Sequence, residues 1–232
     1  GYRKSGLTFA PEAGSQRLRN IINKNITEED IYGAVEQAVE LGWNHIKLYF
    51  MDGLPGETYE DLDGIGEIAR NIMDINYRLR GRQGGRFRVT ISVSNFVPKP
   101  HTPFQWEGQI SMEEYLRRVK LLRDNMRAKN VTYNWHDPDT SLIEAVLSRG
   151  DRRLGPVIEA VWRDGGRLEA WGEYFSFERW MNMFAACGVD PAFYANRTRD
   201  PDERLPWDVI SLGVNKACLQ RERKAAYASR LT

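Results

Sequence analysis

The residues best suited to chemistry lie in a glycine turn at residues 52–58. Gly53 and Gly56 allow positive φ and a close approach of the backbone to a ligand, and Pro55 stiffens the turn. A capping box at Thr58 starts the helix that follows. A strand, a glycine turn and a helix N-terminus together present backbone N–H groups that suit an anionic or nucleotide ligand. An ordinary βα turn with two glycines explains the stretch equally well.

Histidines and aspartates provide a second group of candidates. His45, His101 and His136 share no spacing typical of a metal site, so structural or surface roles are expected. His101 is the best functional candidate of the three, because its proline-bounded loop should follow a strand end. Asp137 and Asp139 flank a proline and either bind a cation or cap the next helix, and capping is the commoner role. The sequence has no serine elbow, Walker loop or dinucleotide glycine motif.

Alternating strands and helices must position these residues. Apolar runs bounded by turn residues predict strands, and apolar spacing after capping residues predicts helices. The predicted strands cover residues 7–11, 45–51, 87–96 and 131–135, and the helices cover 17–22, 31–41 and the stretches after Thr58 and Ser111. Residues 45–51 are expected to be buried on both faces of the sheet. Repeated βα order is typical of a parallel sheet or barrel.

The strand signals disappear after residue 137. Helices are predicted at residues 141–148, 156–163, 177–187 and 214–230, so we expect one part at 1–137 and a helical extension at 138–232. The aromatic residues of this extension are expected to form a core rather than a base-stacking platform. They are Trp162, Trp171, Tyr174, Phe175, Phe177, Trp180, Phe184, Phe193, Tyr194 and Trp207. Residues 80–86 are predicted to form a solvated loop.

Composition excludes several classes of protein. The chain has 232 residues, 41% hydrophobic and 28% charged, with a net charge of +1, so a polybasic nucleic-acid binder is not expected. No apolar run reaches membrane-spanning length. The two cysteines, Cys187 and Cys218, form no disulfide framework or metal cluster and fit the reducing cytoplasm. No secretory signal is visible, and the start at Gly1, a few residues before a strand, predicts a piece of a longer protein.

Three segments in order resemble one family. Thr8–Ser15, Ile46–Thr58 and Ser94–Phe104 are similar to the second half of the radical S-adenosylmethionine (radical SAM) core, in the branch with elongator-type and methylthiotransferase-type enzymes. The tail segments 144–154 and 205–214 also resemble cobalamin-binding-domain radical SAM proteins of unassigned substrate. The resemblance covers nearly the whole chain.

This resemblance implies an α/β fold, the C-terminal half of a partial (β/α)6 TIM-type barrel with parallel strands, followed by an α-helical extension. In the family, a three-cysteine loop holds a [4Fe–4S] cluster, and S-adenosylmethionine chelates its open iron. Reductive cleavage then gives a 5′-deoxyadenosyl radical that abstracts hydrogen from a substrate. The chain lacks that loop, so the resemblance implies a fragment whose cluster and missing barrel half belong to the intact protein. Cobalamin use in that protein stays open.

Carried over by position, the resemblance implies a set of contacts to S-adenosylmethionine. Glu12 and Ser15 would face the ribose and the aminoacid moiety, Gly53, Pro55 and Gly56 the adenine, and Ser94, Asn95, Phe96 and Val97 the adenine edge and face. The family commonly has a second serine where Ala13 stands and an apolar residue where Asp52 stands. Arg17 is either a contact to the carboxylate of the cofactor or a solvated helix residue.

Two alternatives remain open from the sequence. One is a barrel lyase or aldolase that binds a phosphate at the glycine turn, although no lysine or metal set is evident for it. The other is a non-catalytic scaffold whose open sheet edge pairs with a second copy of the chain. Catalytic residues, substrate and redox partner are not identified by the sequence, and no membrane partner is expected.

Overall fold

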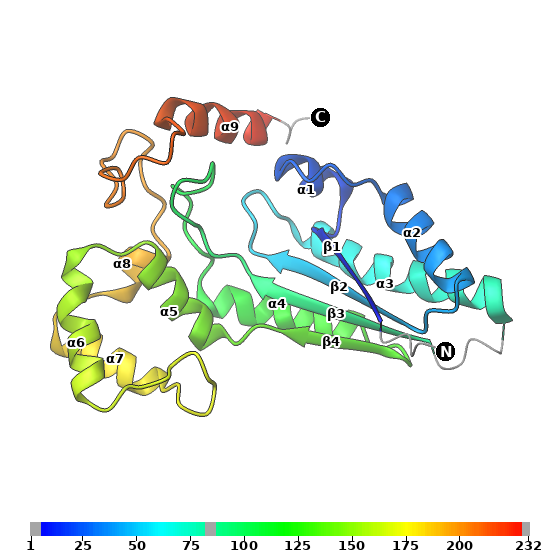
Figure 1. Cartoon of the computed structure of the whole chain (residues 1–232), viewed down its shortest axis with the longest axis horizontal. Helices are drawn as coiled ribbons and strands as arrows, with labels where there is room; N and C mark the ends of the chain where they lie inside the picture. The colour runs from blue at the N-terminus through cyan, green and yellow to red at the C-terminus, as the bar shows by residue number, and fades with distance from the viewer. Residues whose placement is uncertain (1–5, 82–86, 229–232) are drawn as a thin grey trace. The chain divides into compact units, whose positions relative to one another are not determined.

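The computed structural model describes residues 6–81 and 87–228, and its contacts divide the chain into two units (Figure 1). The first unit contains the described residues up to Phe96, Glu113–His136 and the described residues from Lys224. The second contains Val97–Met112 and Asp137–Arg223. The division expected from the sequence lies at residue 137, whereas contacts also assign Val97–Met112 to the second unit.

The first unit is a parallel sheet with helices between its strands. Its elements are β1 Leu7–Glu12, α1 Gln16–Ile21, α2 Glu28–Glu40, β2 His45–Asp52, α3 Tyr59–Arg80, β3 Arg88–Asn95, α4 Met112–Asn125 and β4 Val131–Trp135. Within the described residues the sheet has four strands in the order β1-β2-β3-β4, and each neighbouring pair is parallel. The α/β class with a parallel sheet is therefore confirmed.

Helix starts in this unit follow from local sequence. Thr27 and Thr58 are both N-caps, and each forms a capping box with the aspartate three residues later, Asp30 or Asp61. Ser15 caps α1 by accepting a hydrogen bond from the backbone N–H of Leu18. These side chains satisfy backbone donors that have no partner within the helix. The sequence predictions for these three caps are confirmed.

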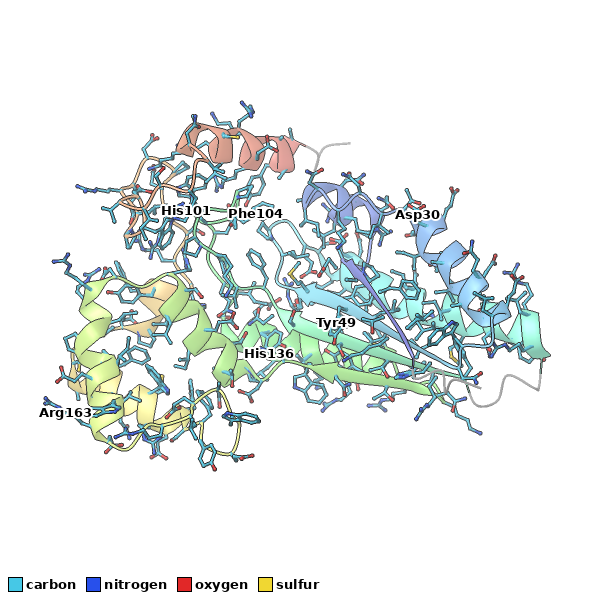
Figure 2. The ribbon with its side chains drawn as sticks, viewed as in Figure 1. Asp30, Tyr49, His101, Phe104, His136 and Arg163 are labelled. Carbon is cyan, nitrogen blue, oxygen red and sulfur yellow. The ribbon has the colours of Figure 1, made fainter. Side chains whose placement is uncertain are left out.

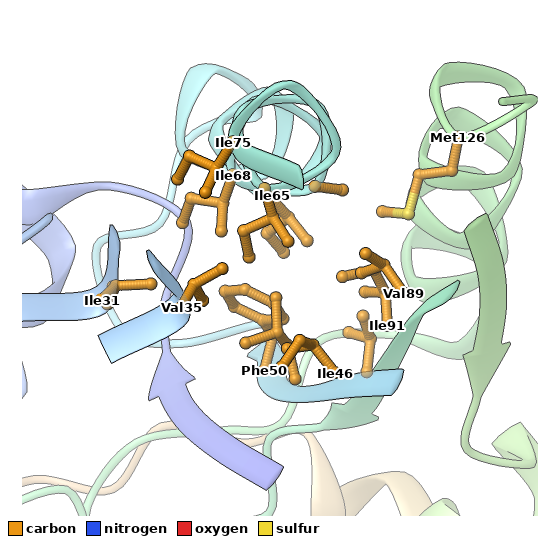
Figure 3. Close-up of a cluster of buried hydrophobic side chains, with 14 of the residues drawn as sticks. Ile31, Val35, Ile46, Phe50, Ile65, Ile68, Ile75, Val89, Ile91 and Met126 are labelled. Atoms are coloured by element: carbon orange, nitrogen blue, oxygen red, sulfur yellow. The ribbon is translucent and has the colours of Figure 1, made fainter. Parts of the chain in front are cut away.

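One face of the sheet packs against α2, α3 and α4 (Figure 3). Ile46, Leu48 and Phe50 of β2 alternate onto this face, and Val89 and Ile91 of β3 lie beside them. Each such buried side chain contributes roughly 1.5–3 kcal/mol relative to an exposed one. This hydrophobic layer fixes the strands and hence the positions of their ends.

The other face of the sheet is more open. Burial alternates along β2, and Tyr49 is 42% exposed, so the expectation that residues 45–51 are buried on both faces was wrong (Figure 2). Thr8 of β1, Thr132 of β4 and Ser94 of β3 are also exposed. The apolar content of β2 comes from its helix-facing side chains, while the residues between them are Lys47, Tyr49 and Met51.

The second unit is helical, as the sequence predicts, with no strand among its described residues. It contains α5 Pro138–Ser148, the 3-10 turn Arg152–Leu154, α6 Gly155–Arg163, α7 Phe177–Ala186, α8 Pro191–Ala195 and the first part of α9 Lys216–Ala228. The short helix α8 was not predicted. Side chains of α5, α6, α7 and α8 form its main core, which includes Val146, Val157, Trp180 and Phe184.

The aromatic residues of this unit divide into two groups. Trp180, Phe184, Tyr194 and Trp207 are buried, which confirms the predicted core role for them. Trp162, Trp171, Tyr174 and Phe193 are 56%, 62%, 51% and 40% exposed, so the prediction was wrong for these four. Trp162 lies on α6, Trp171 and Tyr174 lie in the loop between α6 and α7, and Phe193 lies on α8. Phe175 and Phe177 are half-buried and pack against the core of this unit.

Two further expectations concern the chain surface. The predicted loop at residues 80–86 lies mostly outside the described residues, since α3 extends to Arg80 and residues 82–86 are not described. Among the described helices, none combines the length and the apolar character that crossing a membrane requires.

Candidate functional site

The carboxyl ends of β1, β2 and β3 lie at one edge of the sheet, because the three strands are parallel neighbours. Asp52 at the end of β2 is level with Asn95 at the end of β3, and Glu12 of β1 pairs with Phe50 of β2. The backbone N–H of Phe96 donates to the carbonyl of Asp52 over 2.7 Å. In open parallel sheets this edge is where ligands bind.

The turn after β1 is tightly packed against α3. Glu12 has a φ of 70°, an uncommon value for a residue other than glycine, and its carboxylate lies 3.4 Å from the ammonium of Lys24. The side chain of Glu12 is 27% exposed. Ala13 is fully buried, and Gly14 lies so close to α3 that a Cβ would meet the carbonyl oxygen of Asp61 at 2.0 Å. Packing therefore fixes the backbone of this turn.

Asp61 joins the first turn to the second. Its carboxylate accepts hydrogen bonds from the hydroxyl of Ser15, the guanidinium of Arg17 and the backbone N–H of Thr58. Arg17 also donates to the carbonyl of Gly56 over 3.0 Å. Burial alone would raise the pKa of Asp61, but the hydrogen bonds from Ser15, Thr58 and Arg17 lower it below its ordinary value. The side chain of Arg17 therefore links the turn after β1 to the turn after β2.

The second turn uses both of its glycines at positive φ. Gly53 has a φ of 86° and Gly56 a φ of 87°, as the sequence predicts for a tight βα turn. The N–H of Gly53 donates to the Oε2 of Glu57 over 2.6 Å, so this amide already has a partner within the chain. Pro55 is buried. A carboxylate side chain therefore holds the start of the turn.

A buried charged cluster lies behind this turn, and we call it the carboxyl–arginine cluster. Arg118 of α4 donates from Nη1 to Asp52 over 3.1 Å and to Glu57 over 2.7 Å, and from Nε to Glu114 over 2.7 Å. The side chains of Asp52 and Glu57 are 0% and 1% exposed, and that of Arg118 is 11% exposed. The phenol of Tyr59 donates to Glu114 over 2.8 Å. Sequence reasoning missed all of these contacts.

Burial and mutual repulsion control the ionisation of this cluster. The pKa of Glu57 is raised well above its ordinary value by burial and by the neighbouring carboxyl of Asp52. Burial also raises the pKa of Asp52, although the positive charge of Arg118 opposes this shift. Burial would lower the pKa of Arg118, but its bond to Glu114 and the charges of Asp52 and Glu57 raise it. Asp52 and Glu57 therefore hold a proton more tightly than exposed carboxyls do.

The end of β3 offers a different set of groups. Ser94 is exposed, with its hydroxyl 3.4 Å from the carbonyl of Phe50, whereas Asn95 is 7% exposed and points toward the helices. The Oδ1 of Asn95 is buried and has no hydrogen-bond partner among the described residues. Val97 belongs to the second unit and packs against the core of that unit. The hydroxyl of Ser94 is thus the accessible polar side-chain group of this strand end.

The histidine candidates have local roles. The ring of His45 lies 2.9 Å from the hydroxyl of Thr90 on the neighbouring strand, which supports the structural role expected for it. His101 has a φ of 58°, and its backbone N–H donates to the side chain of Gln105 within the second unit. His136 continues β4 through a bond from its N–H to the carbonyl of Val93.

Asp137 is the N-cap of α5. Capping was the commoner of the two roles expected for it. Its carboxylate accepts from the backbone N–H of Thr140 over 2.8 Å. We expect Asp137→Ala to lower the free energy of unfolding by about 1 kcal/mol, because the first turn of α5 loses its side-chain acceptor. Urea unfolding measures this change, and Asp139→Ala, which removes no cap, should cost at most about 0.5 kcal/mol. A Tm of the wild-type protein that rises with added Ca²⁺ would contradict a pure capping role.

The described residues contain no group of three or more histidine, cysteine, aspartate or glutamate side chains arranged to hold a metal ion. Cys187 and Cys218 are free and half-buried. An iron–sulfur cluster requires several thiolates in one place. The residues of this chain therefore do not fit an iron–sulfur cluster.

The fold and site define an α/β protein with a parallel sheet, two clamped turns at its carboxyl edge and a buried carboxyl–arginine cluster behind them. An uncharacterized protein of Methanocaldococcus jannaschii, MJ0966, is 32% identical over 184 residues, which are 79% of this chain and 38% of that protein. A probable acetate kinase, EutP of Escherichia coli, is 32% identical over 80 residues, 33% of this chain and 49% of EutP. The chain thus spans less than half the length of these relatives. No protein-family model and no solved structure matches it.

Proposed function

We propose that this chain is part of a radical SAM enzyme and supplies part of the S-adenosylmethionine pocket at the carboxyl edge of its sheet. The sheet would be the C-terminal half of a partial (β/α)6 barrel. The proposal rests on the resemblance of three consecutive strand-end segments to that family, together with the geometry of those ends.

The observation that carries the proposal is the arrangement of the three strand ends beside an open sheet face. Parallel sheets normally have both faces covered. Here one face packs against α2, α3 and α4, whereas Tyr49, Ser94 and Thr132 on the other face are exposed. An open polar face is what the interior of a half barrel would present, with the rest of the barrel supplied by a longer protein.

The groups available to the cofactor differ among the three ends. Glu12 has a partly exposed carboxylate that would accept from the ribose hydroxyls or the ammonium, and Ser94 has an exposed hydroxyl. The hydroxyl of Ser15 already donates to Asp61, so we assign it to holding the turn rather than to direct contact. The amide of Phe96 is likewise used by Asp52, so we assign the half-buried ring of Phe96, rather than its amide, to the adenine.

The residues of this chain do not fit an iron–sulfur cluster. We therefore assign no step of radical formation to this chain. What this chain would contribute is binding and orientation of the nucleoside and exclusion of water from it. The iron ligands, the reducing electron and the substrate site would come from other parts of the intact protein.

Isothermal titration of the purified chain with S-adenosylmethionine tests this proposal. We expect binding, and we expect Glu12→Gln to weaken it at least about tenfold because a charge-assisted hydrogen bond is lost. Glu67→Gln is the matched control, since Glu67 is an exposed carboxylate on α3. Binding of inorganic phosphate alone would favour the lyase alternative, and binding of neither ligand would favour the scaffold.

A second experiment uses a longer gene product that contains this chain. After anaerobic reconstitution with iron and sulfide, we expect release of 5′-deoxyadenosine from S-adenosylmethionine. A longer product without a Cys-x-x-x-Cys-x-x-Cys loop upstream of this chain would overturn the radical assignment.

A further inference from the structure

The two buried carboxyls behind the glycine turn are each only half satisfied. The Oδ1 of Asp52 accepts from Arg118, and the Oε2 of Glu57 accepts from both Gly53 and Arg118. The second oxygens, Oδ2 of Asp52 and Oε1 of Glu57, are buried and accept no hydrogen bond from the described residues. The Nη1 of Arg118 bonds to both carboxyls, 3.1 Å from Asp52 and 2.7 Å from Glu57, so the two groups are neighbours. Two neighbouring buried carboxyls, each with an unused acceptor oxygen, favour the binding of a proton.

Charge counting in the cluster leads to the same conclusion. Among the described ion pairs, Arg118 is the one cation of both Asp52 and Glu57, and it also pairs with Glu114, which Arg117 contacts as well. The phenols nearest the cluster, Tyr59 and Tyr133, carry no compensating positive charge. Two adjacent carboxylates with no exposure to water cost far more than one carboxylate and one carboxylic acid.

We propose that Asp52 and Glu57 share one proton, and that this pair, clamped by Arg118, is the positioning element that fixes the Gly53–Gly56 turn for the nucleoside. The positioning role rests on the proposed function, whereas the shared proton does not. None of the three side chains, Asp52, Glu57 and Arg118, would contact the cofactor.

The contacts of the pair connect three elements. The Oε2 of Glu57 accepts a hydrogen bond from the N–H of Gly53 and thereby fixes the first peptide of the turn. The backbone carbonyl of Asp52 accepts from Phe96 at the end of β3. Arg118 ties both carboxyls to α4. Loss of the two carboxyls would therefore release the turn from α4 and leave the backbone bond to β3 as its remaining tie.

The direction of the pH dependence follows from the raised pKa of Glu57, which burial and the neighbouring Asp52 cause. A carboxyl whose pKa is higher in the folded than in the unfolded protein stabilises the fold fully below its unfolded pKa. That contribution is lost as the pH rises through the folded pKa. The turn should therefore loosen as the pH rises through the folded pKa of Glu57, while Arg118 and Glu114 remain charged.

Glutamine at position 57 imitates the proton-carrying state. Its amide oxygen can accept from Gly53 and Arg118, while its NH₂ group donates to Asp52. We therefore expect Glu57→Gln to keep the Gly53 amide protected from hydrogen exchange and to remove the loosening with rising pH. Glu57→Ala should raise the exchange rate of Gly53 by at least about tenfold, because that amide loses its acceptor. Glu60→Gln, an exposed neighbour in the first turn of α3, is the control.

Three readouts on the full chain test the proposal. Difference infrared spectra should show a protonated-carboxyl band at neutral pH that Glu57→Gln or Asp52→Asn removes and Glu60→Gln retains. Exchange of the Gly53 amide should accelerate with pH beyond the intrinsic rate in the wild type and not in Glu57→Gln. S-adenosylmethionine affinity should fall at least about tenfold in Glu57→Ala and stay within about twofold in Glu57→Gln.

The outcomes separate the two proposals. Absence of the infrared band, or equal loss of Gly53 protection in Glu57→Gln and Glu57→Ala, would overturn the shared proton. S-adenosylmethionine binding that is unchanged in Glu57→Ala would overturn the positioning role. The chain could show the infrared band and the exchange pattern but not bind S-adenosylmethionine. That result would support the shared proton and overturn the proposed function.

Discussion

Arg118→Gln is expected to lower the free energy of unfolding by about 3–5 kcal/mol at neutral pH, because the change leaves buried carboxyls without their cation. Arg118 donates to Asp52, Glu57 and Glu114, and the side chains of the first two are shielded from water. A glutamine is too short and neutral to replace these contacts. Urea unfolding followed by circular dichroism measures the loss.

The matched control is the neighbouring residue on α4. Arg117 is 59% exposed and pairs with Glu113 and Glu114 along the helix surface. Exposed pairs of this kind contribute about 0–1 kcal/mol, so Arg117→Gln should cost no more than that. Equal losses in Arg117→Gln and Arg118→Gln would show that the carboxyl–arginine cluster does not depend on its buried cation.

A double variant identifies charge as the cause of the loss. Asp52→Asn removes one of the two fully buried carboxyls, so the further cost of Arg118→Gln should be smaller in that background than in the wild type. The cost of Arg118→Gln alone should also fall as the pH is lowered, because protonated carboxyls need no cation. A cost that is the same in both backgrounds and at every pH would assign the effect to lost packing instead.

Gly14→Ala is expected to destabilise the first unit by about 3 kcal/mol, because the added methyl group has no space. Its Cβ would meet the carbonyl oxygen of Asp61 at 2.0 Å and the backbone nitrogen of Ile65 at 2.7 Å. Both atoms belong to the main chain of α3, which cannot move aside as a flexible side chain can. The turn after β1 would have to shift away from α3, and Ser15 would lose its bond to Asp61.

Gly33→Ala is the matched control for this prediction. Gly33 lies inside α2, and a Cβ there meets nothing within 4 Å. Alanine is favoured over glycine in a helix, so this change should stabilise the protein by about 0.5–1 kcal/mol. Opposite signs for the two substitutions, measured by urea unfolding, would confirm that close backbone packing alone makes Gly14 indispensable. A loss below about 1 kcal/mol in Gly14→Ala would contradict that packing.

The sequence by itself determined the local structure. Alternation of Val89, Ile91 and Val93 with polar residues marks β3, and capping boxes at Thr27 and Thr58 mark two helix starts. These signals act between residues at most four apart, so they are readable without a fold. The parallel sheet, its repeated βα order and the positive φ of Gly53 and Gly56 follow from such local rules.

Tertiary structure alone decided how the site is held together. Arg118 is 66 residues from Asp52 in sequence and Arg17 is 44 from Asp61, yet each pair is bonded. The one available signal was Asp52 itself, a charged residue in line with the apolar residues Ile46, Leu48 and Phe50 of β2. A buried carboxyl needs a partner, but which cation reaches it depends on how α4 packs on the sheet, and that packing is set by apolar contacts distant in sequence from the charges.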